Sequence, residues 1–181
     1  TRGGVHSEFT ITRENKQSFY LVSAGAFQRL DHDWIRRWMP KDNSVQLENI
    51  TNNIGVLVIA GPKSRELLNR VSKDDYSNES FPWLTAKQIN IGLAPSLAIR
   101  MNFVGELGWE LYIPMQQAKT IYHYLMEAGI SHDLIHAGAH AMDIMRMEKM
   151  YLHWGHDISP GENPFEAGLE FAVRLKKKED F

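Results

Sequence analysis

The sequence contains no cysteine among its 181 residues. Without cysteine, the chain has no disulfide framework, no thiolate nucleophile and no cysteine-ligated metal. It also has no apolar run long enough to span a membrane and no signal-peptide pattern at its start, so we expect no membrane partner. The Gly-x-Ser-x-Gly turn of α/β-hydrolases and the Gly-x-Gly-x-x-Gly loop of dinucleotide-binding domains are missing as well. Neither a Ser-His-Asp hydrolase nor a flavin site within this chain is therefore indicated.

The chain also has little excess charge of either sign. Its 22 acidic and 20 basic side chains give a formal net charge of −2. A nucleic-acid-binding domain normally carries a basic patch, so we expect no nucleic-acid partner. Hydrophobic residues make up 43% and charged residues 23% of the sequence, which is typical of a globular domain. A chain of this length can bury a sizeable core as one domain or as a tight pair.

The histidines raise the question of a metal site. Three of them recur every four residues and two more lie three apart, namely His132, His136, His140, His153 and His156. Helical histidines at this spacing can chelate zinc, but no acid occupies the general-base position of a His-Glu-x-x-His motif. Ser131 and Gly138 indicate a helix end and a loop instead of one continuous helix. We therefore expect no metal site.

The hydrophobic pattern predicts both strands and helices, without a regular βαβ rhythm. Strands are expected at residues 5–12, 18–23, 45–50, 55–60, 86–91 and 97–103. Helices are expected at residues 25–39, 62–71, 115–128 and 139–151. The first helix should bury one face bearing Phe27, Leu30, Trp34 and Trp38, and it should stop at Pro40. This order of elements indicates an α+β fold.

The most informative stretch is residues 103–114. It places Glu106 and Glu110 around a turn in which Gly105 and Gly108 permit positive φ angles and sharp reversals. The following residues alternate as in a strand, with Trp109, Leu111 and Ile113 on one face and Glu110 and Tyr112 on the other. A carboxylate beside a tyrosine is suited to a ligand edge that presents N–H donors. Spacing alone favours the simpler interpretation, a β-hairpin with a solvated acidic turn.

The amino-acid sequence of this stretch resembles a segment of a known protein family. Phe103-x-Gly105-Glu106-x-Gly108-x-Glu110 is similar to the Tyr-Thr-Gly-Glu-x-Gly-x-Glu segment of the glycine-cleavage T-protein family. Those proteins are aminomethyltransferases, and related folate domains form the tails of dimethylglycine and sarcosine dehydrogenases. Further segments that match in order are Gly-Gly-Val-His-Ser-Glu (3–8), Ala-Gly-Pro (60–62), Ala-Met-Asp-Ile-Met-Arg-Met-Glu (141–148) and Trp-Gly-His-Asp-Ile (154–158).

The resemblance implies an α+β domain with mixed or antiparallel sheets flanked by helices. It implies a tetrahydrofolate-dependent transfer of an aminomethyl or iminium carbon that forms 5,10-methylene-tetrahydrofolate. The iminium would derive from an N-methyl amine oxidised by a dimethylglycine or sarcosine dehydrogenase-like parent. Any FAD would then belong to a domain outside this chain, which would be an intramolecular partner.

Family members of this type are about twice as long as the present chain. Residues 1–181 are therefore interpreted as one folate-binding domain, a fragment whose flanking segments are missing. The family resemblance places such a protein in the cytoplasm if it is bacterial and in the mitochondrial matrix if it is eukaryotic.

Individual site residues follow from matching positions. Glu110 matches the glutamate that grips the pterin, whose 2-amino group and ring N–H could both donate to one carboxylate. Glu8 matches the second acid of an Asp-Asp pair that orients the folate amine and handles its proton. It is one methylene longer than Asp, and Ser7 replaces the first acid. Four further ligand contacts are expected at Phe103, Tyr20, Ser23 and Met142.

Met142 also helps to distinguish between the alternative functions of the domain. It stands where stand-alone aminomethyltransferases have Arg, which favours the dehydrogenase-tail branch and weakens a stand-alone aminomethyltransferase. A second alternative is a non-catalytic relative of the pyruvate dehydrogenase phosphatase regulatory subunit, which residues 38–42 resemble. Loss of the two acids at positions 8 and 110 would favour this non-catalytic alternative, but Glu8 and Glu110 are both present.

Overall fold

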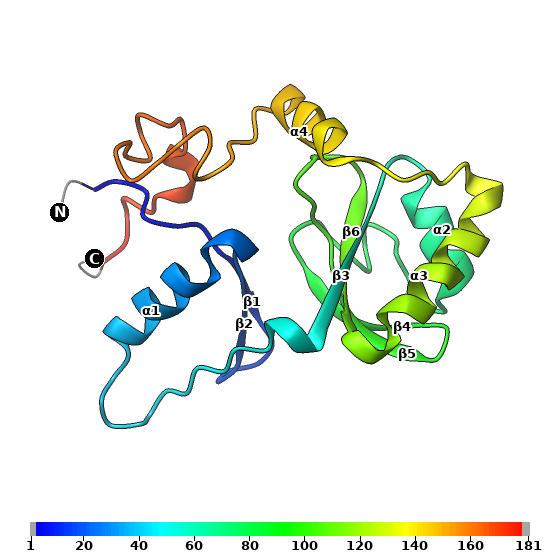
Figure 1. Ribbon diagram of the computed structural model, residues 1–181, viewed down its shortest axis with the longest axis horizontal. Coiled ribbons are helices and arrows are strands. Elements are labelled where there is room, and N and C mark those ends of the chain that lie inside the picture. Colours follow the sequence, from blue (N-terminus) through cyan, green and yellow to red (C-terminus); the bar gives the residue numbers. More distant parts are fainter. Residues whose placement is uncertain (1–2, 179–181) are drawn as a thin grey trace. The chain divides into compact units, whose positions relative to one another are not determined.

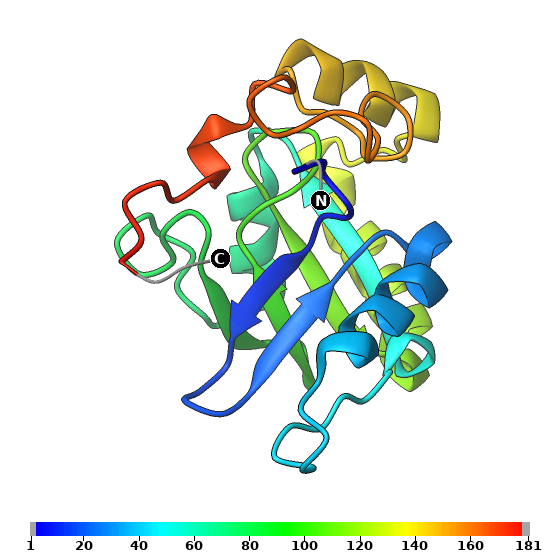
Figure 2. The same cartoon turned by 90° about the vertical axis from the view of Figure 1, so that its left-hand side faces the viewer.

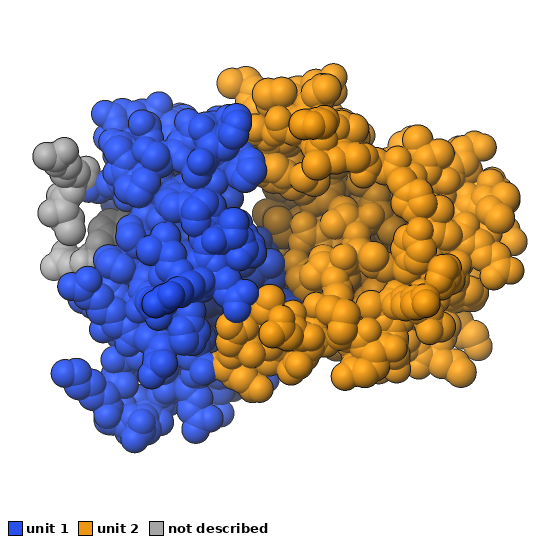
Figure 3. Space-filling model, viewed as in Figure 1, with its two compact units in different colours: residues 1–47, 152–181 blue, residues 48–151 orange. Residues whose placement is uncertain are grey.

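Residues 3–178 are described by a computed structural model (Figure 1). They divide into two compact units, which Figure 3 shows in separate colours. Unit 1 combines residues 1–47 with residues 152–181, and unit 2 is the continuous segment 48–151. Each unit is built from its own elements.

Unit 2 is organised around a four-stranded sheet with the strand order β3-β6-β5-β4. The strands are β3 (Ile54–Ala60), β4 (Ala86–Ile91), β5 (Ala94–Ile99) and β6 (Gly108–Pro114). All three pairings are antiparallel. The sheet thus follows the expected α+β pattern, and β4 covers the predicted strand at residues 86–91 without a shift.

Helices α2 (Ser64–Val71) and α3 (Met115–Gly129) cover one face of this sheet (Figures 1 and 2). The fully buried residues of β6 on that face are Trp109, Leu111 and Ile113. They pack in one core cluster with Leu67 and Leu68 of α2 and with Ile121 and Leu125 of α3. The alternation predicted for β6 is therefore confirmed, because its apolar positions all point toward the helices.

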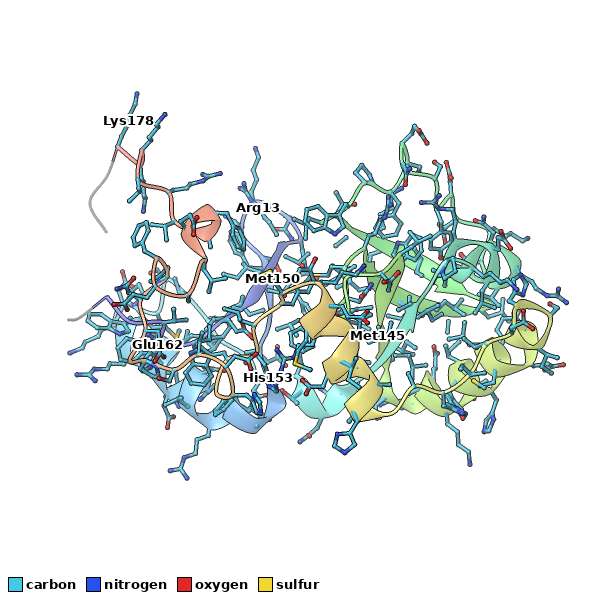
Figure 4. All side chains as sticks on the ribbon, turned by 90° about the horizontal axis from the view of Figure 1, so that it is seen from above. Arg13, Met145, Met150, His153, Glu162 and Lys178 are labelled. Atoms are coloured by element: carbon cyan, nitrogen blue, oxygen red, sulfur yellow. The ribbon has the colours of Figure 1, made fainter. Side chains whose placement is uncertain are left out.

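Helix α4 (Ala139–Glu148) follows α3 after the short 3₁₀ helix Ile130–His132 and a loop. The break between α3 and α4 was expected from Ser131 and Gly138 and is confirmed. Met145 lies on α4, and Met150 lies just beyond its end (Figure 4). Met150 adopts a positive φ of 57°, so the helix stops short of the predicted residue 151.

The two glycines of the β6 turn have different roles. Gly105 has a φ of 67°, as expected. The prediction of a positive φ at Gly108 is wrong. A Cβ at Gly108 would instead collide with the carbonyl oxygen of Ile59 on β3. Glycine is therefore required at position 108 because two strand backbones approach each other there.

Strand β5 begins three residues earlier than predicted and ends at Ile99 instead of residue 103. It includes Pro95, a residue that normally opposes a central strand. The proline is tolerated because β6 pairs with β5 only at Leu97, Ala98 and Ile99. The remaining residues up to position 107 form the loop into β6.

Unit 1 contains a two-stranded antiparallel hairpin of β1 (Thr10–Arg13) and β2 (Phe19–Val22). A 3₁₀ turn, Gly25–Phe27, then leads into helix α1 (Gln28–Trp38). Helix α1 ends before Pro40, as predicted. Its expected apolar face is only partly buried, because Trp38 is 69% exposed and the residue of α1 that is buried is Asp31.

Two strand predictions are wrong in this part of the chain. Residues 5–9 precede β1 and lie outside it, and Val5 is hydrogen-bonded to the C-terminal part of unit 1. The Val5 amide donates to the carbonyl of Glu162 at 2.9 Å, and the Trp154 indole donates to the carbonyl of Val5 at 2.8 Å. Residues 45–50 form no strand, and Val45 there is 49% exposed.

Candidate functional site

The face of the unit 2 sheet opposite α2 and α3 carries Glu110 and Tyr112. Both belong to β6, and their spacing of two residues places them on the same face. The Tyr112 hydroxyl donates a 2.6 Å hydrogen bond to Oε2 of Glu110. This bond fixes one carboxylate oxygen and leaves the other, Oε1, for a further donor.

Apolar residues flank this carboxylate on the neighbouring strands. Glu110 is paired with Val58 of β3 and with Ile99 of β5. Val58 is 55% exposed, while Ile99 is buried. Burial raises the pKa of Glu110 above its ordinary value, and the hydrogen bond from Tyr112 lowers it in part. The site thus combines a directed acceptor with an apolar surface.

Phe103 lies in the loop that leads into β6. The guanidinium of Arg146 lies 5.8 Å from the centre of the Phe103 ring. Arg146 is buried on α4, and its Nε donates to Asp143 at 2.7 Å while Nη1 donates to the Tyr151 carbonyl at 2.9 Å. Arg146 and Asp143 therefore form an ion pair within α4. Phe103 is held against α4 by the same arginine.

Met142 and Glu106 complete the unit 2 residues singled out from the sequence. Met142 is on α4 and is 42% exposed. Glu106 forms an ion pair with the ammonium of Lys149 at 3.1 Å. Of the two glutamates in the glycine-rich stretch, Glu106 is thus already paired with a cation, whereas within residues 3–178 Glu110 is bonded to the neutral hydroxyl of Tyr112.

Glu8 belongs to unit 1 and lies just before β1. Its side chain is exposed by surface area, yet the surrounding protein desolvates the carboxylate enough to raise its pKa. The charge of His153 acts in the opposite direction and lowers that pKa. His153, which Figure 4 labels, follows the return of the chain from unit 2 into unit 1.

Tyr20 and Ser23 are the other predicted residues in unit 1. Tyr20 is half-buried on β2, opposite Thr12, and burial followed by the charge of Glu14 raises the pKa of its hydroxyl. Ser23 is half-buried directly after β2. The six predicted residues therefore divide evenly, with Glu8, Tyr20 and Ser23 in unit 1 and Glu110, Phe103 and Met142 in unit 2.

Sequence reasoning missed Asp31. This residue is 3% exposed, and its Oδ1 accepts a 2.5 Å hydrogen bond from the hydroxyl of Ser7. Its Oδ2 is buried without a hydrogen-bond partner among residues 3–178. The motif resemblance matches Ser7 to the first acid of the family pair, and the hydrogen bond joins Ser7 to a carboxylate 24 residues away. The only signal in the sequence was an acid inside an otherwise amphipathic helix.

The predicted absence of a metal site stays a prediction. Within residues 3–178, no group of three or more histidine, aspartate or glutamate side chains is arranged to hold a metal ion. His136 is instead hydrogen-bonded to the Tyr122 hydroxyl at 2.8 Å. No helix in the part of the chain that the structure describes is long and apolar enough to cross a membrane.

Solved structures define the class of fold. The chain superposes on the glycine cleavage system aminomethyltransferase T from Bartonella henselae with a TM-score of 0.78. The match covers 97% of this chain and 45% of that protein, at 22% sequence identity. The fold is therefore the aminomethyltransferase T fold, which confirms the α+β expectation.

The sequence comparisons narrow this class to a family. Residues 1–177 match the family described as the GCVT N-terminal domain, and the chain belongs to it. The mitochondrial dimethylglycine dehydrogenase of Mus musculus is 36% identical over 181 residues, and the mitochondrial sarcosine dehydrogenase of Homo sapiens is 36% identical over 196 residues. The mitochondrial pyruvate dehydrogenase phosphatase regulatory subunit of Mus musculus is 32% identical over 180 residues.

Each of these three relatives is matched along 99% of the present chain. The chain spans about a fifth of their length, with coverage of 21% for the two dehydrogenases and 20% for the regulatory subunit. The resemblance drawn from the motifs is thereby confirmed at the level of the family.

Proposed function

We propose that this domain binds tetrahydrofolate and promotes transfer of a one-carbon unit to it. The observation that carries the proposal is the Glu110 carboxylate, which is directed by Tyr112 on an apolar sheet face. A reduced pterin is flat and presents an amino group beside a ring N–H. An apolar surface with one directed carboxylate fits such a ring, because the ring plane packs on aliphatic side chains while its edge donates to oxygen.

The electrostatics of Glu110 suit a ligand that donates hydrogen bonds. Burial already raises the pKa of this carboxyl, so its ionised form lacks full solvation. Donors on the ligand would replace the missing water, and hydrogen bonds to an ionised acceptor are about twice as strong as neutral ones. Glu110 therefore orients the ring as well as binding it.

Glu8 is proposed as the group that handles the proton. Bound tetrahydrofolate would supply two amine nitrogens that can bond in turn to the carbon of an iminium. Each new nitrogen–carbon bond releases an N–H proton. The departing amine nitrogen takes back the electron pair of its bond to carbon together with one of these two protons. Glu8 is suited to accept a released proton because its desolvated carboxylate has a raised pKa. The product would be 5,10-methylene-tetrahydrofolate.

The source of the iminium is proposed from the relatives. Two of them are named dehydrogenases of dimethylglycine and sarcosine, which are N-methyl amines. A parent protein of this kind would oxidise the amine with a flavin held in another domain. An iminium in open water hydrolyses to formaldehyde, so the domain should also restrict access of water to the transfer site.

The binding step is tested by calorimetric titration of a reduced folate into the natural full-length protein. Glu110→Gln should weaken binding roughly tenfold or more, the scale of one lost charge-assisted hydrogen bond. Glu106→Gln is the matched control, because it removes a glutamate of the same stretch that is already paired with Lys149. Equal weakening by both variants, or by neither, would refute the assignment of Glu110.

The transfer step needs a separate assay with the amine substrate and tetrahydrofolate. Glu8→Gln should lower the yield of methylene-tetrahydrofolate and raise the release of free formaldehyde, with folate binding retained. His153→Gln should change the pH dependence of the same partition, since His153 lowers the pKa of Glu8. A Glu8→Gln enzyme with an unchanged partition would exclude Glu8 as the proton acceptor.

A second candidate is a regulatory function without catalysis. Its support is the 32% identity to the phosphatase regulatory subunit, close to the 36% found for the dehydrogenases. Well-folded wild-type protein that binds no reduced folate would favour this candidate and overturn the first.

A further inference from the structure

Two arginines of unit 2 share a single neutral acceptor. Arg65 on α2 donates from Nη2 to Oδ1 of Asn78 at 2.7 Å, and Arg100 donates from its own Nη2 to the same oxygen at 2.7 Å. Arg100 also donates from Nη1 to the carbonyl of Phe81 at 2.6 Å. Two guanidinium groups thus converge on one exposed amide oxygen.

No carboxylate balances this convergence. Among residues 3–178, neither Arg65 nor Arg100 forms an ion pair with an acidic side chain. The Nε of Arg65 is buried and has no hydrogen-bond partner within the same residues. Arg65 also lies in the first turn of α2, where the helix dipole disfavours a cation. Partial burial and then the nearby charge of Arg65 lower the pKa of Arg100.

A third cation lies on the adjoining segment. The ammonium of Lys87 donates to the Ser80 hydroxyl at 2.8 Å and lies 5.2 Å from the centre of the Phe81 ring. Phe81 is the residue whose carbonyl Arg100 holds. The loop at residues 77–81 is therefore surrounded by three basic side chains on α2, β4 and the end of β5.

This cluster is separate from the carboxylate proposed to bind folate. The guanidinium of Arg100 lies 5.6 Å from the centre of the Trp109 ring. Trp109 points to the helix-covered face of the sheet, whereas Glu110 points to the opposite face. A pterin bound at Glu110 therefore cannot be the ligand of the arginines.

We propose that Arg65 and Arg100, whose guanidiniums converge at Asn78, form an oxyanion-binding site that takes a carboxylate or a phosphate group in place of the Asn78 amide oxygen. Two guanidiniums can each present paired N–H donors to such a group, which offers several acceptor oxygens in place of one amide oxygen. The anion would remove the repulsion between the two arginines and supply an acceptor for Arg65. The charge of the ligand follows from these side chains. The two arginines offer only donors, and the oxygen of Asn78 is the one side-chain acceptor of the group.

The test is thermal unfolding of the full-length protein during titration with inorganic phosphate, with chloride adjusted to hold the ionic strength constant. Wild-type protein should show a saturable rise in Tm. Arg65→Gln and Arg100→Gln should each weaken the apparent affinity for phosphate roughly tenfold or more. Arg70→Gln is the matched control, because it removes the same charge from the same helix at a residue whose partner is Ser131.

A second titration with acetate identifies the source of the ligand group. A stronger response to acetate would assign the site to a carboxylate, such as a side chain of an acidic protein segment, and a stronger response to phosphate would assign it to a phosphorylated ligand. Asn78→Ala should retain the response to the preferred ion, since the anion replaces the lost amide oxygen.

An equal rise in Tm in wild type and in all arginine variants would mean a general effect of anions. If the Tm of wild type shows no saturable rise, the arginines only hold the loop. Either result overturns the proposal. If Arg100→Gln does not fold, Arg65→Gln against Arg70→Gln decides the question alone.

Discussion

The two units of the chain are stabilised in different ways. Every residue of the hydrophobic core cluster lies between positions 59 and 128, within unit 2. Among the described residues of unit 1, the buried apolar side chains are Trp154 and Ile158, and the buried residue of its helix is an aspartate. Unit 1 is held mainly by aromatic pairs and by polar contacts such as Ser7 with Asp31.

This difference bears directly on the two glutamates. Glu110 stands on a strand whose other face is fully buried, so its backbone is fixed by the core. Glu8 stands in a segment before β1 that is held at Val5, whose amide donates to Glu162 and whose carbonyl accepts from Trp154. Local stability follows the density of buried apolar contacts. We expect the carboxylate proposed to bind the pterin ring, Glu110, to be rigid and the carboxylate proposed to accept the proton, Glu8, to move more.

The largest effect is expected from Trp109→Ala in unit 2. Trp109 is fully buried and makes edge-on contacts with the rings of Tyr76 and Phe81. Its removal should lower the free energy of unfolding by about 3–5 kcal/mol. Val58→Ala, on the exposed face of β3, should cost less than about 1 kcal/mol. Urea denaturation would measure both, and similar losses would contradict the assignment of the core to one face.

A smaller effect is expected from Asp31→Ala in unit 1. The change removes the acceptor of the Ser7 hydroxyl and should cost about 1–3 kcal/mol. Asp33→Ala is the control, since Asp33 is exposed and paired only at 3.8 Å with Arg29 and His32. A double-mutant cycle with Ser7→Ala should show coupling of at least about 0.5 kcal/mol. Strict additivity would mean that the bond does not hold unit 1 together.

The pH dependence of stability should report Glu110. Its raised pKa means that the folded protein keeps this proton to higher pH than the unfolded chain does. The carboxyl therefore contributes most at low pH, and the contribution is lost as pH rises from its ordinary pKa through the raised one. Glu110→Gln should thus gain stability relative to wild type as pH rises over that window. Chemical denaturation at several pH values would measure the difference in unfolding free energy between wild type and Glu110→Gln. A difference that does not change with pH would show that Glu110 is well solvated.

The smallest effect is expected from Tyr112→Phe, which keeps the ring and removes the hydroxyl. The hydrogen bond from Tyr112 lowers the pKa of Glu110, so its loss should raise that pKa further. Folate affinity should fall by at most roughly tenfold and should recover in part at higher pH. An NMR titration of the Glu110 carboxyl carbon measures the pKa directly. A lower pKa in the variant would contradict the role given to Tyr112.

The sequence was a good guide wherever burial is one-sided. The alternation of β6 and the helix over residues 115–128 were predicted because their apolar residues all face one core. The start of β5 was predicted at residue 97 and lies at Ala94, and Pro95 is accommodated there because β6 leaves that end of β5 unpaired. The β-branched residues at 45–50 predict a strand, but nothing in the sequence shows whether such a run finds a partner strand.

Contacts between distant residues could not be predicted from spacing. The Ser7–Asp31 hydrogen bond joins residues 24 apart in the sequence. Asn78 accepts hydrogen bonds from two arginines that lie 13 and 22 residues away. Neither set forms a local motif. The positions of Glu8 and Glu110 as functional candidates came from the family resemblance, and the structure adds the hydroxyl and the apolar neighbours that give Glu110 its chemistry.

Gly108 and Glu110 belong to one short motif, but the close approach of β3 constrains only Gly108. A side chain at Gly108 would force the strands apart, so this glycine has to persist in any descendant that keeps the fold. Glu110 has no such constraint, because it lies on the face opposite the core and could be replaced without repacking. A lineage that abandons the ligand would therefore be free to lose the glutamate but would have to retain the glycine.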